Sequence, residues 1–472
     1  MVFSSLTFLC IFLPVVLALY YLLPTLRIRN VLLIAVSLLF YAYGEPVYVL
    51  LMIASIIINY IFGRLLGTEN KKRRQWILAI AVVINIGLLV VFKYLDMMVQ
   101  TVNQLSGSEI PLVGLALPIG ISFFTFQALS YVIDVYRREV EPQKNLWNVM
   151  LYISFFPQLI AGPIVKYHDI QEQIDNRNTD VKEIAEGLRR FIIGLSKKVL
   201  ISNTMAVTAD ALFAAGAGEL NILSAWIAAI AYMLQIYFDF SGYSDMAIGL
   251  GHMFGFRFLE NFRYPYISVN MQEFWRRWHI SLSTWFKEYL YIPLGGNRKG
   301  KARTCLNKMI VFFSTGLWHG ANWTFVLWGL WHGVFLLFEQ VCPVKKLPKV
   351  LAHIYALLVV CVGFVMFRAD TFGQGMFMIG TMFGGWEFSS VQMAIVWEQL
   401  TPIFLVTLVV AVFGSAPLIP KAAEACLVRE NLRKPATYFS YMASFVLLIL
   451  CMLSLSSGTY NLFILDFRGF AK

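Results

Sequence analysis

The chain has 472 residues, of which 59% are hydrophobic and 14% are charged, with a net charge of +11. Soluble proteins carry about 25% charged residues, so this depletion excludes an array of soluble domains and predicts one polytopic membrane domain built from helices. The basic residues fall in short clusters between apolar segments, which is how membrane proteins mark their cytoplasmic side. We therefore expect no nucleic acid partner.

The cysteines and the N-terminus carry little further signal. The six cysteines form no Cys-x-x-Cys pair and mostly lie in apolar runs, which favours small buried hydrophobes over disulfides or metal ligands. No His-x-x-x-His or Glu-x-x-His pair occurs, so no metal is expected. The first 24 residues have no basic start and no small-residue cleavage site, which indicates a retained first span and not a signal peptide.

The first part of the chain alternates apolar segments with polar turns. We expect membrane spans at 3–23, 31–43, 47–66 and 77–95. The basic cluster at 71–74 lies before the last of these and should be cytoplasmic.

The following segment sets the orientation. Residues 96–114 are polar and contain no Lys or Arg, as expected of an outside loop, and 115–136 return to the basic pair Arg137 and Arg138. Alternating these segments predicts an N-terminus outside the cytoplasm.

The apolar stretch at 150–167 contains two prolines and a glycine. This composition predicts a broken or re-entrant segment, which membrane depth tolerates only where protein or a water-filled cavity satisfies the backbone. Residues 168–186 form the longest polar loop and should be cytoplasmic, and spans are expected at 191–215 and 223–250.

The stretch at 270–293 is rich in tryptophan yet carries several charges, so we expect an amphipathic helix that is interfacial or buried in protein. Its apolar residues recur at helical spacing, at Phe274, Trp278, Leu282 and Trp285. A basic turn at 295–303 follows and should be cytoplasmic.

The remaining apolar stretches complete a set of about eleven to thirteen membrane elements, some shorter than a full span. These stretches lie at 309–341, 350–367, 376–385, 400–418 and 438–455.

His319 stands in an otherwise apolar sequence, within Gly-Leu-Trp-His-Gly at 316–320. An ionisable side chain at membrane depth is a candidate functional group, here a general base for acyl or proton transfer inside a tunnel. The alternative is a histidine that packs between helices. Trp318 would line the same path, and Asn322 would either donate to a developing oxyanion or tie helices together.

The same pentapeptide recurs at 329–333 and contains His332. The two histidines are 13 positions apart, which corresponds to about 220° around a helix. On one unbroken helix they could not share a cavity, so we expect His319 to be the working residue and His332 to be structural.

His279 ends the sequence Trp-Arg-Arg-Trp-His. One interpretation makes it a second cavity histidine, with Trp278 lining the path and Arg276 helping to bind a phosphate-bearing substrate. The other is an interfacial helix whose Trp and Arg side chains lie at headgroup level.

Two aspartates six residues apart, Asp239 and Asp245, are separated by about 240° on a helix, so they do not form a paired carboxylate site on one face. Asp239 shares its face with Tyr243. These side chains would line a substrate path, or the carboxylates would pair with basic residues such as Arg276 or Arg277 and stabilise the bundle. The second interpretation is favoured for both aspartates.

Together these motifs resemble the membrane-bound O-acyltransferases, and more narrowly the bacterial alginate-acetylation branch of that family. The matching stretches follow one another along nearly the whole chain. They lie at 118–127, 134–137, 156–164, 239–247, 274–283, 291–300 and 317–320.

The resemblance implies a ring of helices around a thin central region that a tunnel crosses. It maps the catalytic histidine of the family onto His319 and the second histidine onto His279. We expect one transmembrane domain over 1–472, made of peripheral N-terminal helices, a catalytic core and C-terminal helices. These parts cover 1–114, 115–341 and 342–472, respectively.

The resemblance also implies an activity. The acyl donor would be a cytoplasmic thioester, acetyl-CoA, and the acetyl group would cross the bacterial cytoplasmic membrane for O-acetylation of a polysaccharide such as alginate or a cell-wall polymer. Relatives that D-alanylate teichoic acid usually lack the Pro-Leu-Gly-Gly-Asn-Arg sequence found at 293–298, which favours acetyl over D-alanyl transfer.

Expected partners are membrane lipid, a separate extracytoplasmic acetyltransferase (SGNH-like) and polysaccharide machinery. The alternatives are a transporter or flippase that performs no chemistry, and a scaffold in a polysaccharide export complex.

Overall fold

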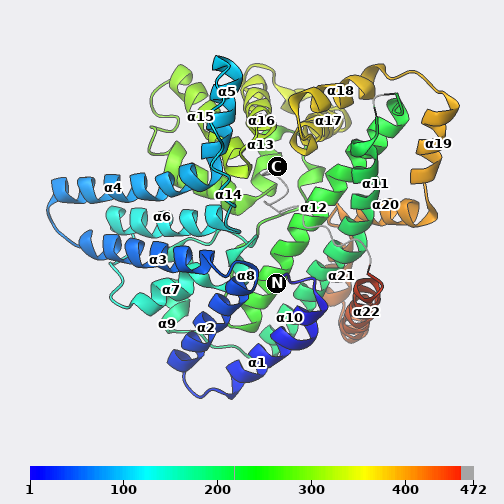
Figure 1. The fold of residues 1–472 in the computed structure, drawn as a ribbon. Helices are drawn as coiled ribbons and strands as arrows, with labels where there is room; N and C mark the ends of the chain where they lie inside the picture. Colours follow the sequence, from blue (N-terminus) through cyan, green and yellow to red (C-terminus); the bar gives the residue numbers. More distant parts are fainter. Residues whose placement is uncertain (217, 459–472) are drawn as a thin grey trace. The chain divides into compact units, whose positions relative to one another are not determined.

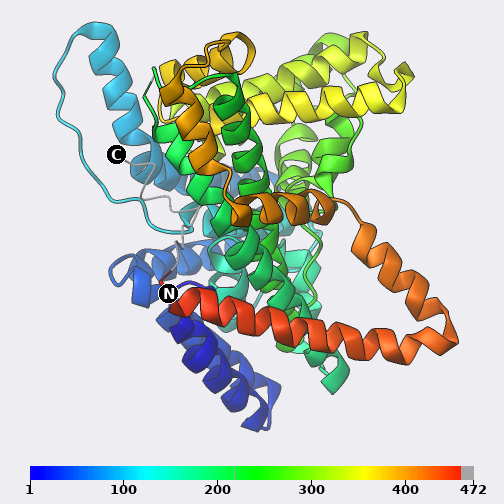
Figure 2. The same ribbon diagram turned by 90° about the vertical axis from the view of Figure 1, so that its right-hand side faces the viewer.

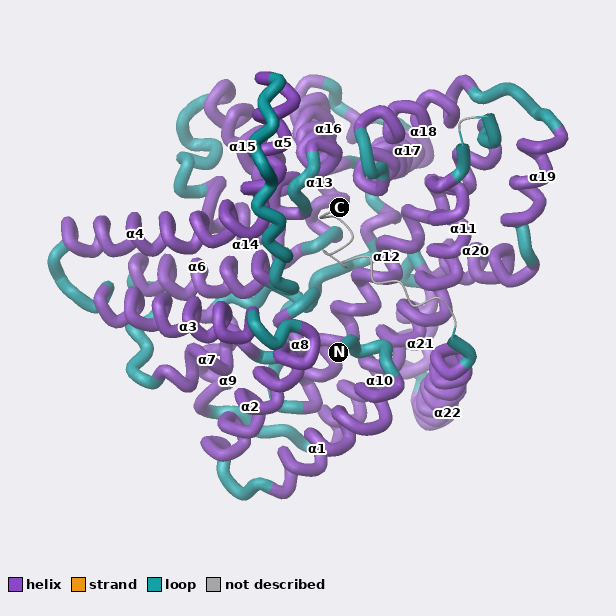
Figure 3. The backbone as a smooth tube through the Cα atoms, in the orientation of Figure 1, coloured by secondary structure: helices purple, strands orange, loops and turns teal. Residues whose placement is uncertain are grey.

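The computed structural model of the chain describes residues 1–216 and 218–458, and within these ranges all regular structure is helical (Figure 3). The predicted all-α, polytopic fold class is confirmed. Figure 1 follows the helices in chain order.

Contacts between residues divide the chain into two compact units, which are described separately. Among the described residues, unit 1 comprises 1–191 and 246–259, and unit 2 comprises the rest. Two helices cross this division along the chain: α10 (Val181–Ser196) begins in unit 1, and α12 (Ile222–Met253) begins in unit 2.

Unit 1 contains mostly long apolar helices followed by short ones. Besides α10 these are α1 (Leu13–Leu22), α2 (Leu26–Gly44), α3 (Tyr48–Leu65), α4 (Lys71–Leu89), α5 (Leu95–Ser106), α6 (Ile121–Arg137), α7 (Leu146–Ser154), α8 (Phe156–Leu159) and α9 (Tyr167–Asp175). Side chains cap several of them: Thr25 accepts from the backbone N–H of Ile28 at the start of α2, and Asn70 does the same for α4.

The core of unit 1 is α6, which is buried along nearly its whole length and contacts α3, α4, α7 and α9. Gly63 lets α3 and α6 approach closely, because a Cβ atom at this position would lie 2.4 Å from the hydroxyl oxygen of Tyr131 on α6. Buried on all sides, α6 can carry polar side chains only where protein atoms or bound groups satisfy them.

Unit 2 contains α11, most of α12 and the described helices that follow α12. These are α11 (Asn203–Ala214), α13 (Met271–Arg277), α14 (Ile280–Phe286), α15 (Lys301–His319), α16 (Trp323–Val341), α17 (Lys349–Arg368), α18 (Phe372–Gly384), α19 (Ser390–Gln399), α20 (Pro402–Gly414), α21 (Leu418–Val428) and α22 (Glu430–Ser456). Figure 2 shows the sharp turn between α21 and α22.

The closest helix pair of unit 2 is the hairpin of α15 and α16. Its backbones nearly touch: a Cβ atom on Gly329 would lie 2.2 Å from the carbonyl oxygen of Phe312, and one on Gly316 would lie 2.5 Å from that of Phe325. Glycine at these positions is what permits the approach.

Seven described helical segments are long and apolar enough to cross a membrane, or eight if the bent pair α19 and α20 is one span. They are Leu26–Gly44, Tyr48–Leu65, Lys71–Ser106, Ile222–Met253, Trp323–Val341, Lys349–Arg368 and Asn431–Ser456. The other elements of the expected set of eleven to thirteen are shorter or broken helices.

Several expected boundaries are corrected by the structure. The expected loop at 96–114 begins with α5, and the expected polar loop at 168–186 contains α9 and the start of α10. A helix as polar as α9 reads as a loop by composition, yet it buries apolar residues at helical spacing. These are Tyr167, Ile170 and Ile174.

The structure also shows where the apolar stretches expected from the sequence are broken. The broken segment predicted at 150–167 is confirmed, since α7 ends at Ser154 and α8 is a single turn. The amphipathic stretch at 270–293 is two short helices and not one, and the stretch at 309–341 is the α15–α16 hairpin. The division into 1–114, 115–341 and 342–472 stays a prediction, and its last residues, 459–472, lie outside the described residues.

Candidate active site

His319 is the last residue of α15 and is surrounded by aromatic rings of unit 2. The centroid of its ring lies 5.0 Å from that of Trp318, 4.9 Å from that of Trp328 and 5.2 Å from that of Phe367. The half-buried imidazole therefore lies among aromatic rings contributed by α15, α16 and α17, which partly shield a neighbouring polar group from bulk water.

The break after His319 follows from the local sequence. Gly320 is extended, and Asn322 caps α16 by accepting a hydrogen bond from the backbone N–H of Thr324 at 3.0 Å. The short turn folds α16 back along α15, and the Trp328 ring thereby packs at nearly a right angle against the His319 ring.

His279 lies between α13 and α14 and is fully buried. Its ring packs against Phe240 of α12 at 4.5 Å and against Trp318 at 5.7 Å, and its centroid is 6.3 Å from that of His319. The structure thus brings together the two histidines that the sequence singled out, and Trp318 contacts both rings. The catalytic roles expected for them stay predictions.

The backbone of His279 is left-handed, with φ 43° and ψ 54°. A residue with a Cβ atom adopts this conformation at a cost of about 1–3 kcal/mol. Such strain persists only where surrounding contacts impose it, and here the carbonyl oxygen of Asn261 accepts from the backbone N–H of Ile280 at 2.9 Å.

His332 lies on α16 and contacts the same tryptophan as His319: the Trp328 ring is 5.0 Å from His332 and 4.9 Å from His319. The sequence argument placed His319 and His332 on different faces of one unbroken helix. The helix breaks at Gly320 and the two residues lie on separate helices, so that argument does not apply. His332 is nevertheless enclosed by Phe274 and Trp275, and neither ring nitrogen has a hydrogen-bond partner among the described residues. Its structural role stays a prediction.

The two aspartates of α12 form ion pairs, but not with the arginines that the sequence suggested. Lys198 lies 2.5 Å from the Oδ1 atom of Asp239, and Lys197 lies 2.6 Å from the Oδ2 atom of Asp245. The pairing with Arg276 or Arg277 is therefore wrong. A π-helical turn at Lys197–Ser202 supplies the lysines.

The suggested arginines are occupied or exposed. Arg277 pairs with Glu273 one turn earlier, at 2.8 Å, and Arg276 is exposed. Glycine at position 242 lets the lysine-bearing segment pack against α12, because a Cβ atom there would lie 2.7 Å from the carbonyl oxygen of Gly194. Tyr243, which lies between the two aspartates in the sequence, is buried.

Two other expected site residues have structural contacts. Asn322 uses its oxygen to cap α16 and its nitrogen to donate to the carbonyl oxygen of Asp370 at 2.9 Å. Trp278 stacks on Phe274 at 5.6 Å and packs against Phe364 at 5.2 Å, within the aromatic core of unit 2. Their expected roles as oxyanion donor and path lining stay predictions.

Sequence reasoning missed the remaining neighbours of the histidine pair. Trp328 and Phe367 lie in apolar stretches where nothing distinguishes them from ordinary core residues, and Phe240 is the apolar residue of a motif whose polar residues drew the attention. Asn261 lies in the irregular segment between α12 and α13. Its only sequence signal is that it is a polar residue in the stretch before the Trp-His motif.

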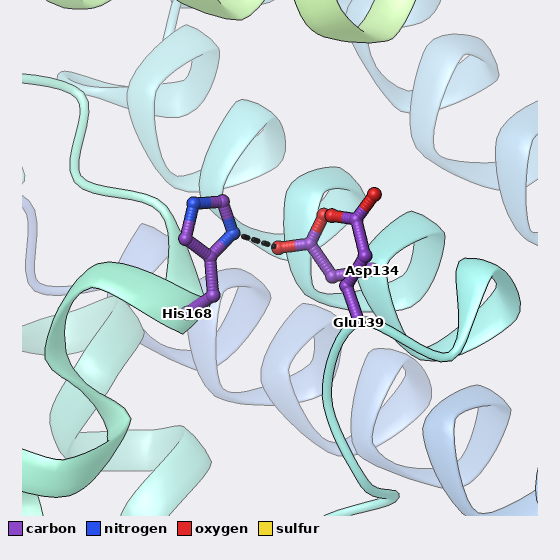
Figure 4. A group of neighbouring side chains, drawn as sticks. All are labelled: Asp134, Glu139 and His168. Atoms are coloured by element: carbon purple, nitrogen blue, oxygen red, sulfur yellow. Dashed lines mark hydrogen bonds and ion pairs between the residues drawn. The ribbon is translucent and has the colours of Figure 1, made fainter.

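A second histidine cluster lies in unit 1, where His168, Asp134 and Glu139 approach one another (Figure 4). The Nδ1 atom of His168 is 3.0 Å from Asp134, and its Nε2 atom is 3.2 Å from Asp169. These hydrogen bonds raise the pKa of His168 to about 10. One ligand atom from each of the three could reach a metal ion, but an ion would have to displace a proton that two carboxylates hold.

The comparisons with known proteins identify the class. Residues 122–345 match the model of the membrane-bound O-acyltransferase family, MBOAT, and one relative is 43% identical over 88% of this chain. The chain belongs to this family and is a multi-pass membrane O-acyltransferase, an enzyme that uses an acyl donor. Family membership favours the enzyme over the transporter and the scaffold that the sequence left open.

Within the family, the chain is similar to enzymes that modify bacterial polymers. The 43% identical relative is the probable alginate O-acetylase AlgI of Azotobacter vinelandii, of which 85% is covered. The peptidoglycan O-acetyltransferase of Helicobacter pylori is 37% identical over 75% of this chain and 73% of its own length. The teichoic acid D-alanyltransferase of Bacillus subtilis is 28% identical over 54% of this chain and 69% of its own length.

Proposed function

We propose that the chain takes an acetyl group from a cytoplasmic thioester, acetyl-CoA, and moves it across the bacterial cytoplasmic membrane for O-acetylation of an extracytoplasmic polysaccharide. Alginate and peptidoglycan are the polymers named for its relatives. The observation that carries the proposal is the histidine pair, His279 and His319, enclosed by aromatic rings at the end of α15.

The enclosure supports a small acyl group. Trp318, Trp328 and Phe367 lie with ring centroids about 5 Å from that of His319, and three large rings at this distance leave little room for a long chain beside the imidazole. In this proposal His319 orients the acyl group or acts as general base, and His279 supports it.

The proposal includes a tunnel through which donor and acceptor meet at His319 from opposite sides of the membrane. The exposed basic residues at 71–73 and 298–303 would attract the anionic CoA on the cytoplasmic side, although topology alone explains the same charges. A separate extracytoplasmic acetyltransferase (SGNH-like), with polysaccharide machinery, would place the acetyl group on the polymer.

The test is transfer of label from acetyl-CoA by the purified full chain in detergent, with a soluble hydroxyl acceptor. His319→Ala should reduce transfer by a factor of about 10² to 10⁴ at unchanged protein level. The same substitution at His332 is the matched control and should retain the wild-type rate. Equal rates for wild type and His319→Ala would end the assignment.

D-alanyl transfer is the second candidate, because a D-alanyltransferase is among the relatives. The same assay separates the two donors when a D-alanyl thioester replaces acetyl-CoA. Acetyl transfer without D-alanyl transfer supports the proposal, and the reverse result contradicts it.

A further inference from the structure

The side chain of Asn261 is fully buried and joins α12, α14 and the turn that carries His279. Its Nδ2 atom donates to the hydroxyl of Ser244, on α12, at 3.0 Å. Its Oδ1 atom accepts from the backbone N–H of Ser281, on α14, at 3.1 Å and lies 3.2 Å from the Nδ1 atom of His279. The hydroxyl of Ser281 donates to the same oxygen at 2.9 Å.

These contacts fix which way the amide of Asn261 faces. A backbone N–H can only donate, so the atom opposite the Ser281 N–H must be the amide oxygen. The Nδ1 atom of His279 faces that same oxygen. It can form this hydrogen bond only if it carries the hydrogen.

The other nitrogen of the ring is then the one without a hydrogen. Among the described residues, the Nε2 atom of His279 has no hydrogen-bond partner, and no carboxylate forms an ion pair with the ring. A fully buried imidazolium without a counter-charge is costly, so the ring is neutral. With hydrogen on Nδ1, the lone pair resides on Nε2.

We propose that Asn261 is a positioning residue that holds His279 as the Nδ1–H tautomer, so that its Nε2 atom accepts the proton of the hydroxyl that takes the acyl group. This inference rests on the proposed function and gives His279 the part of general base, which leaves His319 to orient the acyl group. Ser244, from the conspicuous motif at 239–247, contributes by holding the amide nitrogen.

The step balances without another reactant. The acceptor oxygen forms a bond to the thioester carbonyl carbon while its proton passes to Nε2 of His279. The carbon–sulfur bond then breaks, and the sulfur leaves with its electron pair. The proton on Nε2 passes to this sulfur, which departs as a thiol and returns the imidazole to its neutral state.

The backbone gives independent support. Asn261 contacts the strained segment twice, through the N–H of Ile280 to its carbonyl oxygen and the N–H of Ser281 to its amide. Both donors follow His279 directly, whose φ of 43° places the ring. One residue therefore holds both the backbone conformation and the tautomer, as the orienting group of a catalytic triad does.

Two substitutions separate positioning from mere packing. Asn261→Leu keeps the volume and removes the acceptor, so transfer from labelled acetyl-CoA should fall by about 100-fold or more with KM for the donor unchanged. Asn261→Asp keeps an acceptor for Nδ1–H and should restore most of the rate. Its carboxylate stabilises the protonated ring, so the acidic limb of the pH–rate profile should move to higher pH.

Asn85→Leu in unit 1 is the matched control. Asn85 is also buried and bonds to Asn59 at 2.8 Å, so its loss should lower the thermal midpoint without slowing transfer per folded molecule. A wild-type rate in folded Asn261→Leu, or an Asn261→Asp variant with an unmoved pH profile, would overturn the inference.

Failure of the donor assignment can be distinguished from failure of the positioning role of Asn261. If wild type transfers nothing from acetyl-CoA, the donor assignment fails, and the Asn261 variants are then compared by O-acylation of polysaccharide in cells. Equal cellular O-acylation in wild type and Asn261→Leu, at equal protein level, would overturn the positioning role there too.

Discussion

His168 of unit 1 and His279 of unit 2 differ in what their ring nitrogens contact. In unit 1, His168 lies between the carboxylates of Asp134 and Asp169, and its pKa is raised to about 10. In unit 2, His279 contacts the neutral amide of Asn261 and the aromatic rings around it. A carboxylate holds a ring charged and therefore unable to accept a proton at neutral pH, whereas an amide fixes the tautomer and leaves a lone pair.

The same contrast applies to the other ionisable groups at depth. Asp239 and Asp245 are each neutralised by a lysine of the turn at 197–202, as His168 is by its carboxylates. His319 and His332, on the α15–α16 hairpin, both have aromatic rings around them. The ion pairs favour a structural role for the two aspartates, whereas aromatic surroundings alone do not separate a working histidine from a structural one.

The largest expected effect comes from replacing the neutral histidine. His279→Asn keeps a residue that tolerates a left-handed backbone but has no basic nitrogen. Transfer from labelled acetyl-CoA should fall by a factor of about 10² to 10⁴, while donor binding is retained. His168→Asn in the same assay is the control and should transfer at the wild-type rate. Equal losses in both variants would remove the distinction between the two units.

Breaking a charge pair should affect stability. Lys198→Met leaves the buried carboxylate of Asp239 without its cation and should destabilise the protein by about 3–5 kcal/mol. Thermal unfolding of the protein in detergent measures this loss. Adding Asp239→Asn removes the unpaired charge and should recover most of it, so the double-mutant cycle gives a large coupling energy. Additive effects would show that the ion pair contributes nothing.

The sequence predicted the fold class and singled out the two histidines as candidates, because apolar run length and an ionisable group in apolar surroundings are local signals. The partners of those groups are not local. Lys197 and Lys198 lie more than forty positions before the aspartates they pair with, and the nearer Arg276 looked equally suitable. Asn261 is 18 positions from His279 and belongs to no periodic pattern.

The break between His319 and His332 is a different case, because its signal was present in the sequence. Gly320 and Asn322 are the residues that end one helix and cap the next. Hydropathy is continuous across them, so the apolar stretch at 309–341 was read as one element. Local capping chemistry decided the geometry of the site where the hydropathy pattern did not.

The smallest expected effect is the pH dependence of stability at His168. Its pKa is raised from 6.5 to about 10 in the folded protein by hydrogen bonds to Asp134 and Asp169. A raised pKa contributes stability that is complete below the unfolded value and is lost as the pH rises toward 10. His168→Gln should therefore lower the thermal midpoint more at pH 6 than at pH 9.5. The His168 side chain is 30% exposed, so protons can reach it from solvent. An equal change in thermal midpoint at both pH values would show that His168 is not held charged by its carboxylates.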